Sequence, residues 1–333
     1  MVIGEFQTSS VSGRPDLSCR GATGCYCINE FRNGSALWSS VVYVNGTSAM
    51  MFEDSFLGGL RSQSSPAVIN HNSNDVTSRW DFVRSEFYVS KVHRSPTQYK
   101  CRYGQNYFFE DTLWSCGDND LEVGATNVNM NIYVRGSGLR FAPYAGRTYT
   151  VIRKIRGGGG IVMDGPGTLR FGRSQYLNVE QADPVDINPD PCIDLGNDTG
   201  TEKYHPCTVC YSGATEVNGG TIDFGGFSLT NMTLSGAGGV VSNAHFVNTT
   251  LANTNLTFTS GIEFSGKTHV DFSDADVSDG DVVVIGRYTG AAPDVAAWRG
   301  RNFAKRGLKA LFSAEGGEIT ASVQQTGVLV IVK

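Results

Sequence analysis

Charged residues are scarce in this chain. Only 18% of its 333 residues are Asp, Glu, Lys or Arg, whereas about 25% is typical of soluble domains. The net charge of −5 gives no reason to expect a nucleic acid partner, which a basic surface would attract. No apolar run approaches the roughly 20 residues of a transmembrane helix, so the sequence predicts no membrane-spanning segment. The first residues, 1–21, are polar and lack the apolar core of a signal peptide.

Signatures of catalysis are also missing. The chain contains neither a Gly-x-Ser-x-Gly elbow nor a His-Glu-x-x-His motif. The Asp-Asp, Gly-His-Gly and Arg-x-Lys motifs expected of polygalacturonase-like enzymes do not occur. The five histidines are scattered, and His245 and His269 lie in strand-like triplets, where an ordinary structural histidine is expected. We therefore expect no catalytic residue, no cofactor and no resident metal.

Glycine, by contrast, is abundant, with 41 residues. From Gly219 to Phe272 the sequence is a train of apolar-polar-apolar triplets, such as Met232-Thr-Leu234 and Ala244-His-Phe246, separated by Gly, Ser, Asn or Thr. Alternation with period two sends every second side chain inward along a β-strand, and glycine permits tight corners. Strands this short do not form an independent sheet, so stacking of successive coils is the economical arrangement.

Two related phrases carry the strongest signal. Gly158-Gly-Gly-Ile-Val-Met-Asp-Gly-Pro-Gly-Thr-Leu-Arg-Phe171 and Tyr211-Ser-Gly-Ala-Thr-Glu-Val-Asn-Gly-Gly-Thr-Ile-Asp-Phe224 both end in Gly-Thr-(Leu/Ile)-x-Phe. They resemble the autotransporter-associated β-strand repeat of bacterial passenger domains. The resemblance covers Gly158 to Phe224, with an unusual insertion in the variable loop. It implies export, display on the bacterial cell surface or secretion, and a rod-like fold; it says little about activity.

The predicted fold is all-β, a single-stranded right-handed parallel β-helix (β-solenoid). Residues 1–35 are expected to be an irregular, Cys-rich segment, and 36–333 the solenoid. Residues 179–210 interrupt the rhythm with several prolines, three cysteines and a run of acids. Because proline cannot donate to a strand ladder, this stretch is predicted to be a loop insertion. Pro293 to Leu311 is the one plausible helix, and its basic residues would bind an acidic partner or form a solvated face. Those basic residues are Arg299, Arg301, Lys305, Arg306 and Lys309.

Eight cysteines are present, an even number that favours disulfides in an oxidising compartment. They are Cys19, Cys25, Cys27, Cys101, Cys116, Cys192, Cys207 and Cys210. The alternative is free or metal-bound thiols in a reducing compartment. Pairing does not follow from sequence, although a bond between Cys101 and Cys116 would close one local loop.

Three further patterns have structural alternatives. Gly261-Ile-Glu-Phe-Ser-Gly-Lys-Thr268 matches a phosphate-binding loop, but its interior alternates like a strand and another strand follows it. His205-Pro-Cys207-Thr-Val-Cys210 has metal-ligand spacing, with Cys192 as a fourth ligand, but a disulfide-stapled loop is the favoured interpretation. An acidic run has neither of the known calcium-loop spacings, and Asp is a routine turn residue. Its members are Asp271, Asp274, Asp276, Asp279 and Asp281.

The sequence thus predicts a structural or adhesive rod without catalytic activity, whose protein or glycan ligand is unknown. The alternative is a polysaccharide-acting β-helix enzyme, a lyase or a tailspike-like glycoside hydrolase. An aligned cluster of Asp, Glu, Arg or Lys in a groove would favour the enzyme. A smooth face of Asn, Thr and Ser would favour the rod.

Overall fold

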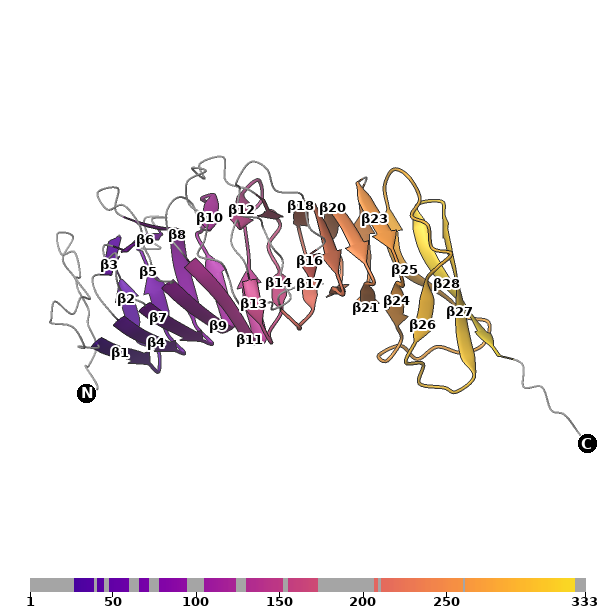
Figure 1. The fold of residues 1–333 in the computed structure, drawn as a ribbon, viewed down its shortest axis with the longest axis horizontal. Helices are drawn as coiled ribbons and strands as arrows, with labels where there is room; N and C mark the ends of the chain where they lie inside the picture. The colour runs from indigo at the N-terminus through magenta and orange to yellow at the C-terminus, as the bar shows by residue number, and fades with distance from the viewer. Residues whose placement is uncertain are drawn as a thin grey trace, which may run out of the picture.

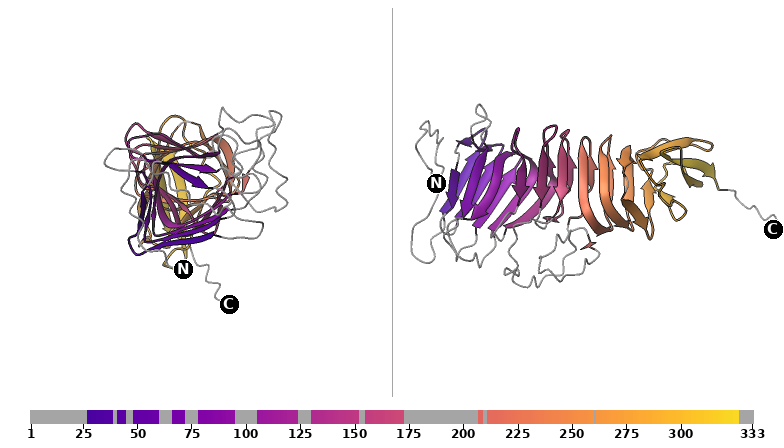
Figure 2. Two further views of the ribbon diagram at one scale, coloured as in Figure 1. Left: turned by 90° about the vertical axis from the view of Figure 1, so that its left-hand side faces the viewer. Right: turned by 90° about the horizontal axis from the view of Figure 1, so that it is seen from above.

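The protein is all-β and elongated. The computed structural model describes residues 27–38, 41–44, 48–59, 66–71, 78–94, 105–123, 130–151, 155–172, 207–208, 211–259 and 261–326. In these ranges it contains 28 strands and no helix. The strands follow one another along a single long axis from the N-terminal to the C-terminal end (Figure 1). Seen along that axis, they surround a common interior (Figure 2).

Most strands are short. The strands of the first half are β1 (Cys27–Arg32), β2 (Ala36–Trp38), β3 (Val41–Val44), β4 (Ser48–Glu53), β5 (Phe56–Gly58), β6 (Ala67–His71), β7 (Ser78–Val83), β8 (Glu86–Arg94), β9 (Gln105–Ser115), β10 (Leu121–Val123), β11 (Met130–Phe141), β12 (Thr148–Val151), β13 (Ile155–Gly157), β14 (Ile161–Met163) and β15 (Thr168–Phe171). Those of the second half are β16 (Cys207–Thr208), β17 (Thr215–Val217), β18 (Thr221–Thr230), β19 (Thr233–Gly236), β20 (Val240–Val247), β21 (Thr250–Thr254), β22 (Leu256–Phe258), β23 (Ile262–Ser265), β24 (His269–Asp271), β25 (Val282–Tyr288), β26 (Arg299–Arg301), β27 (Leu308–Glu315) and β28 (Glu318–Gln325).

Almost all ladders are parallel. β1 pairs with β4, β4 with β7, β7 with β9 and β9 with β11, each one step further along the axis. The register partners Ile28 and Ala49 are 21 residues apart, and Ala49 and Arg79 are 30 apart. Spacings near 20–45 residues are typical of repeat units that contact only their neighbours. The structure therefore confirms an all-β fold built from stacked, mainly parallel strands.

A column of aromatic rings runs through the interior of the N-terminal half. Phe31 stacks on Phe52 with ring centroids 4.6 Å apart, Phe52 on Phe82 at 4.9 Å, and Phe82 on Phe109 at 5.3 Å. These rings are in register on successive strands, and the last three are fully buried. Full burial of a Phe side chain contributes about 1.5–3 kcal/mol through the hydrophobic effect. The alternation of buried and accessible residues along each strand thus fills the core.

The two related segments, Gly158–Phe171 and Tyr211–Phe224, lie on neighbouring coils, where a coil is one turn of the chain around the long axis. Thr168 pairs with Thr221 and Leu169 with Ile222, while Phe171 stacks on Phe224 at 5.4 Å. A bridge between Gly157 and Tyr211 aligns their starts. Another aromatic series continues from Phe224 through Phe246 and Phe264. The sequence similarity of the two phrases is therefore matched by equivalent positions in the stack.

The structure places strand residues inside two segments that the sequence predicted to lie outside the solenoid. β1 begins at Cys27, inside the segment 1–35 that was predicted to be irregular, because Phe31 joins the aromatic column. Within the predicted insertion, 179–210, only Cys207–Thr208 is described; this pair forms β16, in register with Leu229 and Thr230 of β18. The rest of 179–210 lies outside the described residues.

The C-terminal end is antiparallel. β25 pairs with β28, and β28 with β27. The predicted helix over Pro293–Leu311 is wrong, since this segment contributes β26 and the start of β27. Gly300 pairs with Val270 in a parallel ladder, and Asn302 and Gly307 adopt positive φ angles of 58° and 77°. Such backbone is incompatible with a continuous right-handed helix.

Candidate functional site

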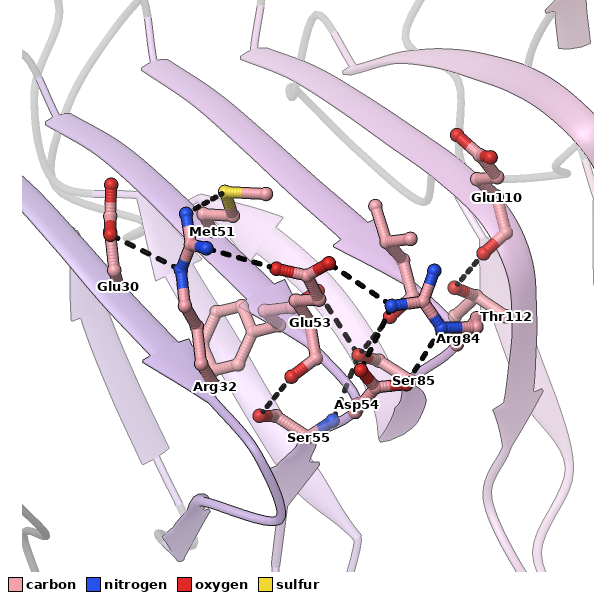
Figure 3. Close-up of polar contacts among 12 residues, drawn as sticks. Glu30, Arg32, Met51, Glu53, Asp54, Ser55, Arg84, Ser85, Glu110 and Thr112 are labelled. Atoms are coloured by element: carbon pink, nitrogen blue, oxygen red, sulfur yellow. Dashed lines mark hydrogen bonds and ion pairs between the residues drawn. The ribbon is translucent and has the colours of Figure 1, made fainter.

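The best-defined polar structure lies on one corner of the N-terminal half. At this corner each coil turns through one residue with positive φ: Asp54 at 50°, Arg84 at 45° and Asp111 at 47°. The next residue carries a hydroxyl that donates to the carbonyl two residues back. Ser85 Oγ lies 2.7 Å from the Val83 oxygen, and Thr112 Oγ1 lies 2.9 Å from that of Glu110 (Figure 3). These buried hydroxyls hold strained corners in identical geometry on successive coils.

A charged ladder runs beside this corner, formed by Glu30, Arg32, Glu53, Asp54 and Arg84 (Figure 3). Arg84 binds both oxygens of Asp54, with Nε–Oδ1 at 2.7 Å and Nη2–Oδ2 at 2.9 Å. Glu53 is held from both sides, by Arg32 of the preceding coil at 3.2 Å and by Arg84 of the following coil at 3.0 Å. The ladder therefore ties three consecutive coils together on the outer surface.

A second cluster, the arginine–phenylalanine cluster, lies on the outer face of β7, β9 and β11. It consists of Arg79, Asp81, Phe108, Tyr133 and Arg135. The guanidinium carbons of Arg79 and Arg135 lie 4.5 and 4.2 Å from the centre of the Phe108 ring, within cation–π range. Asp81 accepts from both arginines, at 2.6 and 3.2 Å. Tyr133 stacks on Phe108 at 4.7 Å.

Hydrogen bonds within the charged ladder shift the pKa values of Asp54 and Arg84. Arg84 donates hydrogen bonds to Asp54, and these hold the pKa of the Asp54 carboxyl below its ordinary value. The same bonds raise the pKa of Arg84 further above its ordinary value. A general acid needs a carboxyl whose pKa is raised toward neutrality. Asp54 is shifted the other way, and Asp81 and Glu53 are each shared by two arginines.

Glu110 differs from these carboxylates. It lies on the same face, in register with Arg135, and forms no ion pair with any residue in the described part of the chain. It is therefore a candidate for an acid on this face if the chain were an enzyme.

A third polar group surrounds His245 on the outer face of β18, β20 and β23. His245 Nδ1 lies 3.2 Å from Ser228 Oγ, and Nε2 lies 2.8 Å from Ser265 Oγ. Both ring nitrogens are therefore satisfied by hydroxyls from the two adjacent coils. This is the structural histidine that the sequence predicted at this position. His269, the other such histidine, lies in β24, and its Nδ1 has no hydrogen-bond partner.

The phosphate-loop pattern is not a phosphate loop. Ile262–Ser265 forms β23 and His269–Asp271 forms β24, which confirms the two predicted strands. The turn between them places Gly266 at a φ of 68° and satisfies the Lys267 N–H with Asn248 Oδ1 at 2.9 Å. No helix opens at Lys267, so the arrangement that cradles phosphate is missing at this position.

Two residues of the acidic run form ion pairs with residues of the C-terminal basic cluster. Asp271 pairs with Arg301 at 3.3 Å, and Asp276 with Lys305 at 3.4 Å. Asp279 and Asp281 accept backbone N–H groups at turns, from Gln325 and Ser278 respectively. These contacts explain four of the five acids as turn and cross-coil partners. Within the described ranges, no three His, Cys, Asp or Glu side chains are grouped to hold a metal ion.

Of the eight cysteines, Cys116 is the one whose side chain the structure describes. It is a buried free thiol whose Sγ lies 3.1 Å from the Asn119 carbonyl oxygen, and burial raises its pKa to about 11. The backbones of Cys27 and Cys207 lie in β1 and β16. The remaining cysteines fall outside the described residues: Cys19, Cys25, Cys101, Cys192 and Cys210. His205, the other proposed metal ligand, also falls outside them.

Comparison of the chain with protein-family models, with curated proteins and with solved structures finds no match. In the described part of the chain, no helix is long and apolar enough to cross a membrane.

The charged ladder and the arginine–phenylalanine cluster were not predicted from sequence. Their partners lie one coil apart, and the coils differ in length, so no fixed spacing marks them. Charged residues are about as dense in 30–135 as in the rest of the chain, so composition gave no signal for these clusters either.

Proposed function

We propose that this protein is a secreted or surface-displayed binding rod of bacterial passenger type, without catalytic activity. In this proposal the stacked strands form a single-stranded right-handed parallel β-helix. The parallel ladders and the stacked position of the two repeat-like phrases support that topology. A stiff rod of this kind presents side chains at fixed spacing along its length.

The proposed absence of catalysis rests on the ion pairs made by carboxylates of the outer face. On the outer face of the N-terminal half, Asp54, Asp81 and Glu53 are ion-paired with arginines of the same or adjacent coils. Glycoside hydrolysis needs two carboxyl groups, one protonated and one free to act as base or nucleophile. The hydrogen bonds with Arg84 lower the pKa of Asp54, which makes this carboxyl a poor proton donor.

We place the binding surface at the arginine–phenylalanine cluster. Arg135 uses only Nη1 for Asp81, and its side chain is 40% exposed. Its remaining N–H groups are the kind of donors that recognise carboxylate or sulfate groups. The cluster therefore suits an acidic surface glycan or an acidic protein segment. Its two arginines outnumber its single carboxylate.

The experiment is a binding assay against a panel of immobilised acidic and neutral polysaccharides. The Arg79→Gln/Arg135→Gln variant should lose binding to any acidic polysaccharide that the wild type retains. Arg170→Gln is the matched control, because Arg170 forms a similar 3.1 Å ion pair with Asp223 on another coil. Equal binding by wild type and both variants would place the binding surface elsewhere.

The second candidate is the polysaccharide-acting enzyme. It is favoured by one feature, the aligned charged residues of the N-terminal outer face together with Glu110, which forms no ion pair with a described residue. Release of new reducing ends or unsaturated products from the same panel would support it.

A further inference from the structure

The C-terminal end of the rod exposes an apolar row. In the described residues the exposed large hydrophobic side chains are those of Tyr144, Val282, Val284 and Leu311. The last three lie on one face of the antiparallel sheet formed by β25, β28 and β27. Val282 and Leu311 both pair with Ser322 of the central strand, so they flank it in a single row. Their exposed fractions are 67% and 51%.

β27 is also an edge strand. Its ladder partner in the described part of the chain is β28 alone, and no other backbone hydrogen bond joins Leu308–Glu315 to described residues. Within the described residues, the N–H and C=O groups along the other edge of this strand therefore have no backbone partner. Such an edge is a template for pairing with another chain.

The charges on this edge are self-complementary. Lys309 and Glu315 are both exposed, lie on the same face as Leu311, and form no ion pair with a described residue. If two copies of β27 pair antiparallel with Phe312 opposite itself, Lys309 faces Glu315 of the partner subunit, and the reverse contact forms as well. Leu311 then lies diagonally across from the partner's Leu311, within reach of a cross-strand contact.

We infer that β27 is an isologous interface through which two copies of this chain pair edge to edge. The β25–β28–β27 sheet continues into that of the partner subunit, joining two rods at their C-terminal ends. The two-fold arrangement satisfies both edges at once and leaves no open strand at the junction. Val282 and Leu311 flank Ser322 in one cross-strand row, and across the junction the partner's Leu311 lies diagonally opposite Leu311. This inference does not depend on the proposed binding function.

The test is sedimentation equilibrium of the 333-residue chain over a wide concentration range. The wild type should form a dimer. Lys309→Glu and Glu315→Lys should each weaken dimerisation about tenfold, because each places like charges opposite one another twice. The double variant Lys309→Glu/Glu315→Lys should restore wild-type affinity. An equimolar mixture of the two single variants should dimerise better than either alone, because their charges complement one another.

Each other outcome counts against the inference. A wild type that stays monomeric at all concentrations overturns it, as does a dimer that neither single variant weakens. A dimer that appears only after removal of residues 327–333 would also overturn it, since that segment would then occupy the edge. Circular dichroism and the unfolding midpoint of each variant show whether the fold is retained. Both residues are exposed, so both signals should match the wild type.

Discussion

Phe171 stacks on Phe224 with their ring centroids 5.4 Å apart and their planes within 8° of parallel. The adjacent residues Arg170 and Asp223 form a 3.1 Å ion pair across 53 residues of sequence. The strands that carry Phe171 and Phe224 are therefore in direct contact, although the predicted insertion, 179–210, lies between them in sequence. The core is continuous across this point, and no inserted side chain separates the two rings.

Deleting residues 179–205 and joining the ends with a short Gly/Ser linker should leave the rod folded. Direct contact between Phe171 and Phe224 carries the packing, and shortening a loop changes its closure entropy only slowly. We expect the free energy of unfolding to change by less than about 1–2 kcal/mol. Denaturant unfolding followed by circular dichroism measures this. Loss of cooperative unfolding would show that the insertion supports the core.

Phe82→Ala should be strongly destabilising. Phe82 is fully buried and contacts Phe52, Phe87 and Phe109 at 4.8–5.3 Å. Truncation leaves a cavity between coils and should cost about 3–5 kcal/mol in guanidinium unfolding. Phe108→Ala is the matched control, since its ring lies on the outer face between two arginines and should cost less than about 2 kcal/mol. Equal losses in the two variants would contradict the assignment of inner and outer faces.

Arg84→Gln should reduce stability in a pH-dependent way. The pKa of Asp54 is lowered in the folded state by its hydrogen bonds with Arg84. A carboxyl with a depressed folded pKa stabilises the fold above its unfolded pKa, about 3.9, and this contribution is lost as the pH falls through the folded value. The stability difference between wild type and variant should therefore be present at neutral pH and shrink as the pH falls below the unfolded pKa of about 3.9.

Arg306→Gln is the control for this measurement, because Arg306 is exposed and forms no ion pair with a described residue. Its stability difference from wild type should stay near zero across the same pH range. A pH-independent effect of Arg84→Gln would mean that the Asp54 pair does not contribute in solution.

Cys116 should be unreactive in the native protein. Burial raises the pKa of its thiol to about 11, so the reactive thiolate is rare at pH 8. Iodoacetamide labelling followed by peptide mass mapping should modify Cys116 only after unfolding. Rapid native labelling, or a disulfide at Cys116, would contradict the structure.

The raised pKa of the Cys116 thiol also predicts that the stability of the fold declines at alkaline pH. The unfolded thiol ionises near pH 8.5, whereas the folded one does so near pH 11. The neutral thiol therefore contributes its full stabilisation below about pH 8.5, and this is lost as the pH rises toward 11. Cys116→Ala should remove that part of the alkaline decline. A variant that declines as steeply as the wild type would show that other groups cause it.

Much of the secondary structure could be predicted from sequence, because the alternation of apolar and polar residues identifies short strands with one buried face. Ala244-His-Phe246 and Leu256-Thr-Phe258 fall in β20 and β22, and each sends its apolar residues into the core. The similarity of Gly158–Phe171 to Tyr211–Phe224 predicted neighbouring coils. Equivalent glycine corners and inward-facing residues recur in both phrases.

The predicted helix failed for a physical reason. Trp298, Leu308 and Leu311 gave only an irregular apolar pattern, and the ladder between Val270 and Gly300 outweighs local helix propensity. The charged ladder was missed because Arg32, Glu53 and Arg84 come together only once the register of unequal coils is known. Ion pairs of this kind depend on tertiary spacing and leave no local motif.

We propose that this protein binds polysaccharide or protein without cleaving it, and a turnover assay on the polysaccharide panel decides between binding and cleavage. Purified protein incubated with each polysaccharide should release no new reducing ends and no unsaturated products above a no-protein control. Glu110→Gln, which removes a candidate acid on the outer face, should behave like the wild type. Reproducible turnover by the wild type that disappears in Glu110→Gln would contradict the claim and establish the enzyme.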